Sequence, residues 1–396
     1  MTALWHPKAE AWVRGRKNLL DTIALNFNEA PNSIIWFHCA SLGEFEQGRP
    51  LMEEIKRKTP SQKIVLTFFS PSGYEIRKNY TGADYIYYLP LDTAKNARRL
   101  VQLFQPKLVI FVKYEFWYHH LKTLYKQKIP IYLIAGHFRE NQVFFKWYGK
   151  WYKQLLHFFD HLFVQNEASK QLLQQYGITT VSIAGDPRID RVFDIIEQVS
   201  TFPKIAHFKA QQPLLIAGST HLNDIKILLP FIKQNKTWKI VLVPHEVNLN
   251  HIQQIQTLLA NPALLYTSDS SPSELANARI LVVNTIGMLS SLYQYAAIAY
   301  IGGGFDTGIH NILEPAIFKL PILIGPKFQK FEEAKALTKQ GSTIIIHNSQ
   351  DFLSSMELLV SVDQQQEYGQ LNRAYLEKHK GGTAILYTFF KQLLEE

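Results

Sequence analysis

The sequence predicts an α/β protein with two Rossmann-like domains, each a parallel sheet covered by helices on both faces. Three observations support this fold. The chain has 396 residues, more than one hydrophobic core usually organises. Short apolar runs alternate with segments of helical length, which is typical of parallel strands buried on both faces. The runs form two series that meet near the segment 192–208, VFDIIEQVSTFPKIAHF.

Each half of the chain is expected to contribute seven strands. In the first half the runs are SIIWFHCA, KIVLTFFS, YIYYLPL, KLVIFVKY, PIYLIAG, HLFVQN and VSIAG. In the second half they are PLLIAG, KIVLVP, ALLYT, RILVVN, AIAYIGG, PILIG and STIIIH. The last segment, AILYTFFKQLLEE, is predicted to be a helix.

Composition and charge limit the possible partners and environments. Residues 1–200 carry 26 Lys and Arg against 18 Asp and Glu, whereas the rest of the chain is nearly neutral. We therefore expect an anionic partner on the first half. The single cysteine, Cys39, rules out an intrachain disulfide and suits a reducing compartment. No apolar run is long enough for a transmembrane helix, and the first twenty residues lack the apolar core of a secretory signal.

Polar residues follow one strand after another. SLGE follows the first strand, Glu115 the fourth, GDPRID the seventh and GSTH the eighth; PHE, NTIGM and GGFDTGIHNILEP follow later ones. Ligands of open α/β sheets bind beyond the carboxyl ends of the strands. We therefore expect a ligand site there, in a cleft between the two domains.

Glu44, in the first turn of a predicted helix, has two interpretations. A carboxylate there favourably caps the helix dipole. Alternatively, Glu44 is a general base aimed at a hydroxyl group, with a pKa raised by burial beside Phe37 and Phe45. Sequence physics alone leaves the two about equal.

Other polar motifs also keep a structural alternative. Arg188 either holds an anion or pairs with Asp186 or Asp190. The glycines of GGGFDTG do not have the spacing of a dinucleotide fingerprint, so a hydride-transfer enzyme is disfavoured. At the helix start that follows, amides near Asn311 would suit a phosphate and Glu314 a ribose, but a capping box would look the same.

Four histidines lie near strand ends and raise the question of a metal: His38, His221, His245 and His310. They show no i, i+4 pairing of the zincin type and have no supporting cysteines. The sequence therefore predicts no metal site.

Residues 139–159, RENQVFFKWYGKWYKQLLHFF, mix lysines with eight aromatic residues. Such a segment suits a membrane surface, where aromatic rings lie at the headgroup level and lysines meet phosphates. A core-facing helix with lysines reaching outward is the alternative. No familiar nucleic-acid motif accompanies the segment, so we expect no nucleic acid partner. The N-terminal stretch with Trp12, Arg14, Arg16 and Lys17 has the same interfacial composition.

Taken in order, the motifs resemble those of the Kdo (3-deoxy-D-manno-octulosonic acid) transferases of lipopolysaccharide and lipid A synthesis. The likeness runs from WVRGRKN at residues 12–18 almost to the C-terminus. It includes ASLGE, SPSGYE, LPLD, PKLVIFVKYEFW, QNE, GSTH, NTIGMLSSLY and GGGFDTGIHNILEP. The chain departs from the usual family pattern at Lys113, Pro187-Arg188, His245 and Asn284–Met288, and keeps Glu44, Asn311 and Glu314.

The resemblance implies a GT-B fold, in which residues 1–198 bind the acceptor and face the membrane. Residues 199–380 would bind the CMP-sugar, and residues 381–396 would form a helix that packs back on the first domain. The implied enzyme is an inverting glycosyltransferase that moves Kdo from CMP-Kdo to a sugar hydroxyl of the lipid A precursor without a metal or other cofactor. It would attach peripherally, or by a short N-terminal anchor, to the cytoplasmic face of the bacterial inner membrane, whose anionic surface is a further partner.

The resemblance also implies a role for individual residues. Glu44 would be the general base, with Glu115 and Arg188 stabilising the transition state. The CMP contacts would be Ser219, Thr220, His221, Pro244, His245, Ile286, Gly287, Met288, Asn311, Ile312, Leu313 and Glu314. The residues facing the acceptor or the membrane would be Arg49, Lys146, Trp147, Lys150 and Trp151.

Two rival functions remain open at this point. One is another GT-B enzyme that uses a UDP-sugar or epimerises a sugar nucleotide. The other is a non-catalytic protein that binds anionic lipid through its basic, aromatic first half.

Overall fold

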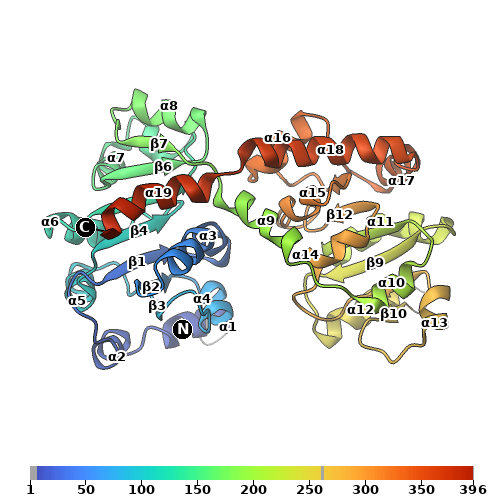
Figure 1. The fold of residues 1–396 in the computed structure, drawn as a ribbon, viewed down its shortest axis with the longest axis horizontal. Helices are drawn as coiled ribbons and strands as arrows, with labels where there is room; N and C mark the ends of the chain where they lie inside the picture. The colour runs from blue at the N-terminus through green and yellow to red at the C-terminus, as the bar shows by residue number, and fades with distance from the viewer. Residues whose placement is uncertain (1–6, 260–262, 396) are drawn as a thin grey trace. The chain divides into compact units, whose positions relative to one another are not determined.

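The computed structural model describes residues 7–259 and 263–395. The chain forms two compact units (Figure 1). The first contains the chain up to Asp190 together with His379 onward, and the second runs from Arg191 to Lys378. The first six residues of the expected first domain and the last residue of the expected C-terminal helix lie outside the described residues.

The first unit is built on a seven-stranded parallel sheet in the order β3-β2-β1-β4-β5-β6-β7. Its strands are β1 (Ile34–Cys39), β2 (Lys63–Phe68), β3 (Tyr85–Tyr88), β4 (Leu108–Val112), β5 (Ile131–Gly136), β6 (His161–Val164) and β7 (Val181–Ile183). The order reverses between β1 and β4, so the crevice beyond their carboxyl ends is where a ligand of such a sheet binds.

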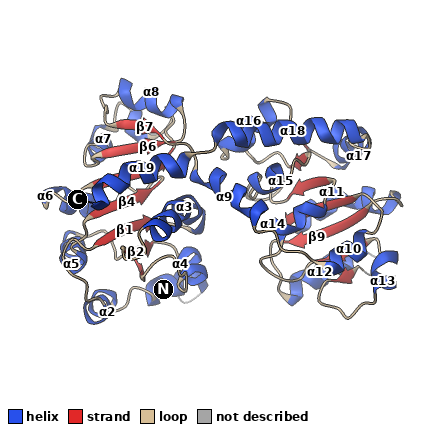
Figure 2. Ribbon diagram, viewed as in Figure 1, coloured by secondary structure: helices blue, strands red, loops and turns tan. Residues whose placement is uncertain are grey.

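Helices separate these strands, and Figure 2 shows the strands of each unit enclosed by helices. They are α1 (Pro7–Arg14), α2 (Leu19–Asn26), α3 (Leu42–Lys58), α4 (Pro71–Arg77), α5 (Ala94–Phe104), α6 (Tyr118–Lys126), the 3-10 turn η2 (Val143–Phe145), α7 (Lys150–Leu156), α8 (Glu167–Gln175), α9 (Pro187–Glu197) and α19 (Gly382–Glu395). The boundary between the units falls within α9, whereas the sequence placed it after residue 198.

The buried strands of the first unit contribute side chains to two hydrophobic clusters, one on each face of the sheet. In β1, Ile34 and Trp36 join one cluster, and Ile35 and Phe37 join the other. This alternation follows from the two-residue period of a strand. Helix α3 packs closely on the second face at Gly48, where an added Cβ would lie 3.0 Å from a methyl of Val112.

Helix α19 returns to the first unit after the second is complete. Its Leu386 and Phe390 are buried in the same cluster as the core residues of α3. The Asp190 carboxylate caps the start of the helix by accepting hydrogen bonds from the backbone N–H groups of Gly381 and Thr383, at 2.5 and 2.6 Å. The predicted packing of the last helix on the first domain is therefore confirmed.

The second unit contains another seven-stranded parallel sheet, in the order β10-β11-β9-β8-β12-β13-β14. Its strands are β8 (Leu214–Thr220), β9 (Lys239–Pro244), β10 (Leu264–Leu265), β11 (Ile280–Val282), β12 (Ile298–Ile301), β13 (Ile322–Ile324) and β14 (Thr343–Ile345). Its helices are α10 (Pro203–Lys209), α11 (Leu222–Gln234), α12 (Leu249–Leu259), α13 (Pro272–Asn277), α14 (Leu289–Leu292), the 3-10 turn η3 (Tyr293–Tyr295), α15 (Leu313–Ile317), α16 (Glu332–Lys339), α17 (Ser349–Leu358) and α18 (Val362–His379).

Thirteen of the fourteen runs predicted as strands contain one of these strands, β8 extends two residues beyond its run, and both sheets are parallel. The predicted class of two Rossmann-like sheets is confirmed. Among the described residues, no helix is both long and apolar enough to cross a bilayer.

Candidate functional site

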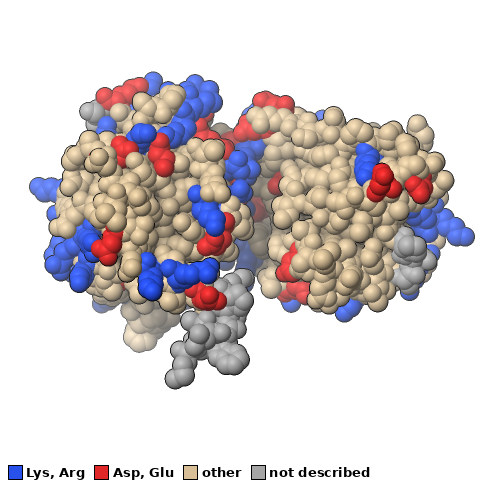
Figure 3. All heavy atoms as spheres, turned by 90° about the horizontal axis from the view of Figure 1, so that it is seen from below, with Lys and Arg blue, Asp and Glu red and all other residues tan. Residues whose placement is uncertain are grey.

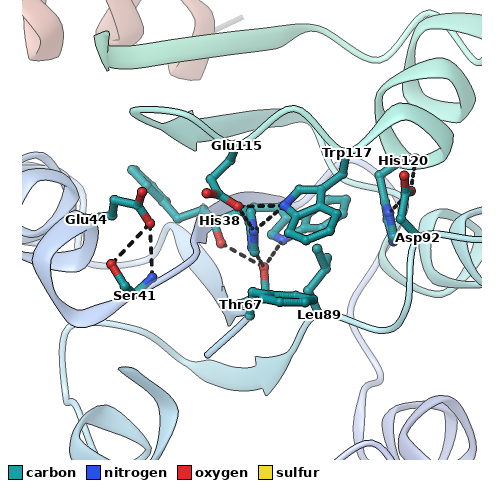
Figure 4. A network of polar contacts seen from close by, with 12 residues as sticks. His38, Ser41, Glu44, Thr67, Leu89, Asp92, Glu115, Trp117 and His120 are labelled. Atoms are coloured by element: carbon teal, nitrogen blue, oxygen red, sulfur yellow. Dashed lines mark hydrogen bonds and ion pairs between the residues drawn. The ribbon is translucent and has the colours of Figure 1, made fainter. Parts of the chain in front are cut away.

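Glu44 lies in the first turn of α3, just beyond the carboxyl end of β1. Its Oε2 accepts a hydrogen bond from the backbone N–H of Ser41 at 3.0 Å and lies 3.4 Å from the Ser41 hydroxyl (Figure 4). The helix-capping interpretation is therefore visible in the geometry. Capping uses one carboxylate oxygen, so it is compatible with a second role for the same group.

The environment of Glu44 gives its carboxyl group an unusual proton affinity. Burial, and after it the negative charge of Glu115, raise its pKa to about 7 against the opposing effects of Lys113 and the backbone N–H groups of Ser41 and Ala40. A carboxyl group with a pKa near neutrality can accept a proton at physiological pH and release it again. This property is what a general base requires.

Glu115, six-per-cent exposed and just past the end of β4, belongs to a buried polar network (Figure 4). Its Oε2 lies 3.0 Å from Nε2 of His38 and accepts a hydrogen bond from Nε1 of Trp117 at 2.6 Å. On the other side of the ring, Nδ1 of His38 lies 2.8 Å from the Thr67 hydroxyl. That hydroxyl in turn accepts a hydrogen bond from Nε1 of Trp36, also at 2.8 Å.

One tautomer of His38 satisfies every member of this network. If Nε2 carries the proton, it donates to Glu115, and Nδ1 accepts the proton of the Thr67 hydroxyl, as hydrogen-bond matching requires. The chain of donors then runs from Trp36 through Thr67 and His38 to the Glu115 carboxylate. The His38 and Trp117 donors, both on Oε2, hold the Glu115 carboxylate in place. Its negative charge acts electrostatically on Glu44.

In the sequence, His38 was a candidate only as a metal ligand, and neither Thr67 nor Trp117 was singled out. A signal was available, because the two-residue period of β1 places Trp36 and His38 on the same face of the strand. A polar residue near the end of an otherwise apolar, fully buried strand requires a hydrogen-bonding partner. The identity of that partner depends on β2 and β4, which only the folded sheet brings alongside.

Beside this network, Asp92 and His120 form a second pair, with 2.7 Å between Oδ1 and Nδ1 (Figure 4). The Asp92 carboxylate also accepts from the backbone N–H groups of His119 and His120, at the start of α6. Burial lowers the pKa of His120 although Asp92 opposes this effect. The pair therefore anchors the first turn of α6, the helix that follows Glu115 in sequence.

Arg188 is engaged by a neighbouring carboxylate. Its Nη2 donates to Oδ2 of Asp186 at 2.6 Å, and Nε lies 3.1 Å from both oxygens of the same group. The Arg188 charge helps to lower the pKa of Asp186 against the effect of burial. The structural alternative that the sequence left open, pairing with Asp186, is thus present, and a further role in holding an anion stays a prediction.

In the second unit, the predicted donor residues of GSTH lie at the end of β8 and the start of α11. Ser219 has a positive φ of 53°, and the Thr220 side chain is fully buried. The buried Asp224 carboxylate ties this turn to the glycine-rich loop after β12, because it accepts hydrogen bonds from the backbone N–H groups of His221 and Gly303, both at 2.8 Å. Asp224 was not singled out in the sequence.

The glycine-rich loop itself approaches β8 closely. An added Cβ at Gly302 would lie 2.4 Å from the carbonyl oxygen of Ser219, so no larger residue fits there. The loop leads to Asn311, whose Oδ1 accepts from the N–H of Leu313 at 3.1 Å and whose amide donates to Glu314 at 2.9 Å. Asn311 thus holds the start of α15 from the residue before its N-cap, Ile312, and the capping box that the sequence allowed is not formed.

The remaining donor candidates follow β9 and β11. Pro244 ends β9, and His245 is exposed immediately after it. Gly287 has a positive φ of 90°, Ile286 is 86% exposed, and Met288 is buried at the start of α14. Ile312 and Leu313 are fully buried, so their side chains belong to the core and only their backbone groups are suitable for ligand contact.

Three of these loops bring His221, His245 and His310 together. One ring nitrogen from each lies within 4.8 Å of those from the other two, which makes this the one histidine- or acid-based cluster of metal-binding geometry in the described part of the chain. His38, in contrast, lies in the first unit within the network around Glu115.

The residues predicted to face the acceptor or membrane differ in their surroundings. Arg49 of α3 donates to Glu53 at 2.6 Å and is largely covered. Trp147 is 87% exposed and Trp151 47%, next to the exposed Lys150 and the half-buried Lys146. Figure 3 shows many Lys and Arg side chains on the first unit in that view.

The N-terminal motif WVRGRKN has a structural role, because its Arg16 packs against other residues of the first unit. The Arg16 guanidinium lies over the rings of Trp12, Phe69 and Tyr88 and donates to the carbonyl oxygens of Leu89 and Phe69. Beside it is an apolar cavity of about 560 Å³, lined by Glu10, Trp12, Val13, Arg14, Arg16, Lys17 and Leu91. The cavity combines apolar walls with a basic rim.

Comparison with known proteins gives two kinds of similarity. Residues 14–191 match the family model described as 3-deoxy-D-manno-octulosonic-acid transferase (kdotransferase). The 3-deoxy-D-manno-octulosonic acid transferase of Aquifex aeolicus is 27% identical over 355 residues, covering 87% of this chain and 92% of that protein. The protein of the same name from Chlamydia muridarum is 27% identical over 371 residues, covering 90% and 84%.

Among solved structures, UDP-GlcNAc 2-epimerase from Neisseria meningitidis matches with a TM-score of 0.63 and 16% identity, covering 90% of this chain and 99% of that one. Acinetobacter baumannii MurG matches with a TM-score of 0.56 and 13% identity, covering 91% and 99%. At these identities the likeness shows the fold alone. It confirms the predicted GT-B class, with two Rossmann-like halves and a long C-terminal helix.

Proposed function

Because the chain belongs to the 3-deoxy-D-manno-octulosonic acid (Kdo) transferase family, and is therefore a glycosyltransferase, we propose that it moves Kdo from CMP-Kdo to a sugar hydroxyl of the lipid A precursor. We further place the reaction among inverting transfers with Glu44 as the general base. The observation that carries this assignment is the position of Glu44 at the switch point of the first sheet, with a pKa near 7.

In the proposed reaction, the Glu44 carboxylate takes the proton of the acceptor hydroxyl while the hydroxyl oxygen attacks the anomeric carbon of Kdo. The new carbon–oxygen bond forms on the face opposite the bond to the CMP phosphate, which breaks, and CMP leaves with the bonding electrons. The proton on Glu44 then passes to solvent, which a pKa of about 7 permits at neutral pH. No atom changes its oxidation state in a way that would require an oxidant or a reductant.

Glu115 and Arg188 have positioning and electrostatic roles in the proposal. Glu115, held by His38 and Trp117, keeps a negative charge near Glu44 and raises its proton affinity. A fixed negative charge would also stabilise the positive charge that develops on the Kdo ring as CMP departs. Arg188 would counter the charge of the Kdo carboxylate or the phosphate from its place beside Asp186.

The second unit supplies the proposed donor site. Backbone N–H groups at the starts of α11 and α15, and the close approach of the loop at Gly302, suit a phosphate and a ribose. Pro244, His245 and the segment 286–288 surround the same edge of the sheet and would contact the base and sugar of CMP. The proposed transfer uses no metal.

For the acceptor, we place the acylated disaccharide and the anionic cytoplasmic face of the inner membrane on the first unit. The exposed Trp147 and Trp151, together with Lys146 and Lys150, have the aromatic and cationic character of an interfacial segment. The cavity beside Trp12 and Val13 has the apolar walls that an acyl chain requires.

CMP release from CMP-Kdo tests this proposal. Wild type, Glu44→Gln and the control Glu54→Gln, which changes a carboxylate of the same helix that pairs with Arg57, are compared with and without lipid A precursor. We expect acceptor-dependent release in wild type and control, and a loss of about 10²–10⁴-fold in Glu44→Gln. No release from folded wild type would overturn the transferase proposal, and unchanged release in Glu44→Gln would leave Glu44 with its capping role.

Nucleotide stabilisation and vesicle binding distinguish the proposed function from its two rivals. CMP should raise the thermal midpoint of unfolding and UDP should not, whereas an enzyme specific for UDP-sugars would show the reverse. A lipid-binding protein without catalytic activity would bind anionic vesicles but turn over no donor.

A further inference from the structure

Three histidines of the second unit come from loops that follow neighbouring strands. His221 follows β8, His245 follows β9 and His310 lies in the loop after β12, and the sheet order is β9-β8-β12. The carboxyl ends of parallel neighbours meet at one edge of a sheet. The fold therefore brings three imidazole rings to one place, although the residues that carry them are separated by 24 and 65 positions in the sequence.

The backbones of these three residues are tied to the same frame. The His221 N–H donates to Asp224 at 2.8 Å, the His245 N–H to the Thr220 carbonyl at 3.0 Å, and the His310 N–H to the Gly302 carbonyl at 3.2 Å. Asp224 also holds the N–H of Gly303. Only rotation of the side chains is left to adjust the distances between the rings.

The three rings lie nearly parallel, with centroids 4.4–5.6 Å apart, and one pair of their nitrogens has the spacing of metal ligands. Nε2 of His221 and Nε2 of His310 are 3.3 Å apart. Zinc binds histidine nitrogen at about 2.0–2.1 Å, so two nitrogens on a tetrahedral ion lie about 3.3–3.4 Å apart. The third nitrogen, from the exposed His245, lies within 4.8 Å of both, and rotation of this ring would bring it to the same spacing.

We infer that His221, His245 and His310 form a binding site for one divalent transition-metal ion of the zinc class, with a fourth position open to an oxygen ligand. Three neutral imidazoles are a strong donor set for Zn²⁺, Co²⁺ and Ni²⁺. The sequence predicted no metal site because these histidines show no i, i+4 pairing and have no supporting cysteines. The inference concerns metal binding by this unit and assigns the ion no step in the proposed transfer.

The lowered pKa values of two of the three rings, His310 and His245, are compatible with this geometry. Burial, together with His245 and His221, lowers the pKa of His310 to about 4. Burial and the charge of His221 also lower the pKa of His245, while Glu246 opposes the effect. A metal requires the unprotonated lone pair, so rings that resist protonation at neutral pH are ready to coordinate. Of two Nε2 atoms 3.3 Å apart, at most one carries a proton.

A cobalt titration of the full-length, tag-free, chelator-treated protein tests the site. Tetrahedral Co²⁺ gives intense visible d–d bands, which we expect to saturate at one equivalent and to vanish when Zn²⁺ displaces it. The titration contains no CMP and no CMP-Kdo. Its outcome is therefore independent of the transferase proposal.

Variants make the test specific. In His245→Ala, an exposed side chain is removed and the fold should be unaffected; Co²⁺ affinity should fall by more than about 100-fold, the upper range for loss of an outer-shell partner. His310→Ala should behave alike, whereas His207→Ala, which removes an exposed histidine of α10, should bind as wild type does. Zn²⁺ should raise the unfolding midpoint of wild type and of His207→Ala only.

Absence of the d–d bands in wild type would overturn the inference. So would bands that survive in both His245→Ala and His310→Ala, because the ion would then be held elsewhere.

Discussion

Nε2 of His38 lies 3.0 Å from Oε2 of Glu115, in a pair that is almost completely removed from solvent. His38 belongs to β1 and Glu115 follows β4, so the pair joins the two strands between which the order of the first sheet reverses. Through this contact a buried strand residue positions a carboxylate that acts electrostatically on Glu44. A core hydrogen-bond network thus contributes, after burial, to the raised pKa of the proposed base.

The pH dependence of turnover should follow Glu44. A base must be ionised to accept a proton, so kcat should rise with pH through about 7 in wild type. Glu115→Gln removes the charge that raises the pKa of Glu44 and should move the midpoint to lower pH. Lys113→Gln removes a charge that lowers this pKa and should move it to higher pH. Kinetic profiles of the three proteins check the directions, and shifts of the same sign in both variants would contradict them.

The stability of the first unit should also depend on Glu44. Its folded-state pKa is raised from 4.5 to about 7, so stability is greatest when the group is protonated, below about pH 4.5, and falls as pH rises through 7. Glu44→Gln removes this loss and still accepts from the Ser41 N–H. Urea unfolding at pH 5 and pH 8 should show a relative gain for the variant of at most about 3 kcal/mol at the higher pH. An identical difference at both pH values would contradict the raised pKa.

Thr67→Val should destabilise the first unit by about 2–4 kcal/mol. The substitution keeps the shape of the fully buried side chain but leaves Nε1 of Trp36 and Nδ1 of His38 without this hydrogen-bond partner. Thr22→Val, at an exposed position of α2, is the matched control and should change stability little. Tryptophan fluorescence during urea unfolding measures both. Equal stability of the two variants would mean that the network contributes nothing.

Trp147→Ser combined with Trp151→Ser should weaken binding to vesicles that contain anionic lipid. The two exposed rings would lose their place at the headgroup level, while Lys146 and Lys150 would keep the electrostatic attraction. Leu249→Ser removes a side chain that is 83% exposed in the second unit and serves as control. Co-sedimentation with vesicles measures the effect, and equal binding of all three proteins would place the membrane contact elsewhere.

The sequence contained most of the local information about this fold. Apolar runs such as KLVIFVKY and PILIG predicted their strands, because a strand buried on both faces must be apolar at consecutive positions. It also indicated that functional groups would follow those strands. Glu44, Glu115 and His221 lie shortly after strand ends, and Asn311 lies at the end of the loop after β12. The sequence could not decide between capping and catalysis at Glu44, because a carboxylate in the first turn of a helix suits both roles. The structure shows the capping contact, which does not exclude a catalytic role.

Contacts between distant segments depended on the order and register of the strands. Parallel sheets pair segments that are not adjacent in sequence: β1 lies between β2 and β4, and β8 between β9 and β12. Only that order brings Thr67 and Glu115 to opposite sides of the His38 ring, and only that order gathers His221, His245 and His310. The sequence by itself determined which segments are strands and helices and which residue types end them. Tertiary structure decided which of those residues meet, since burial, charge and hydrogen bonding act through space and not along the chain.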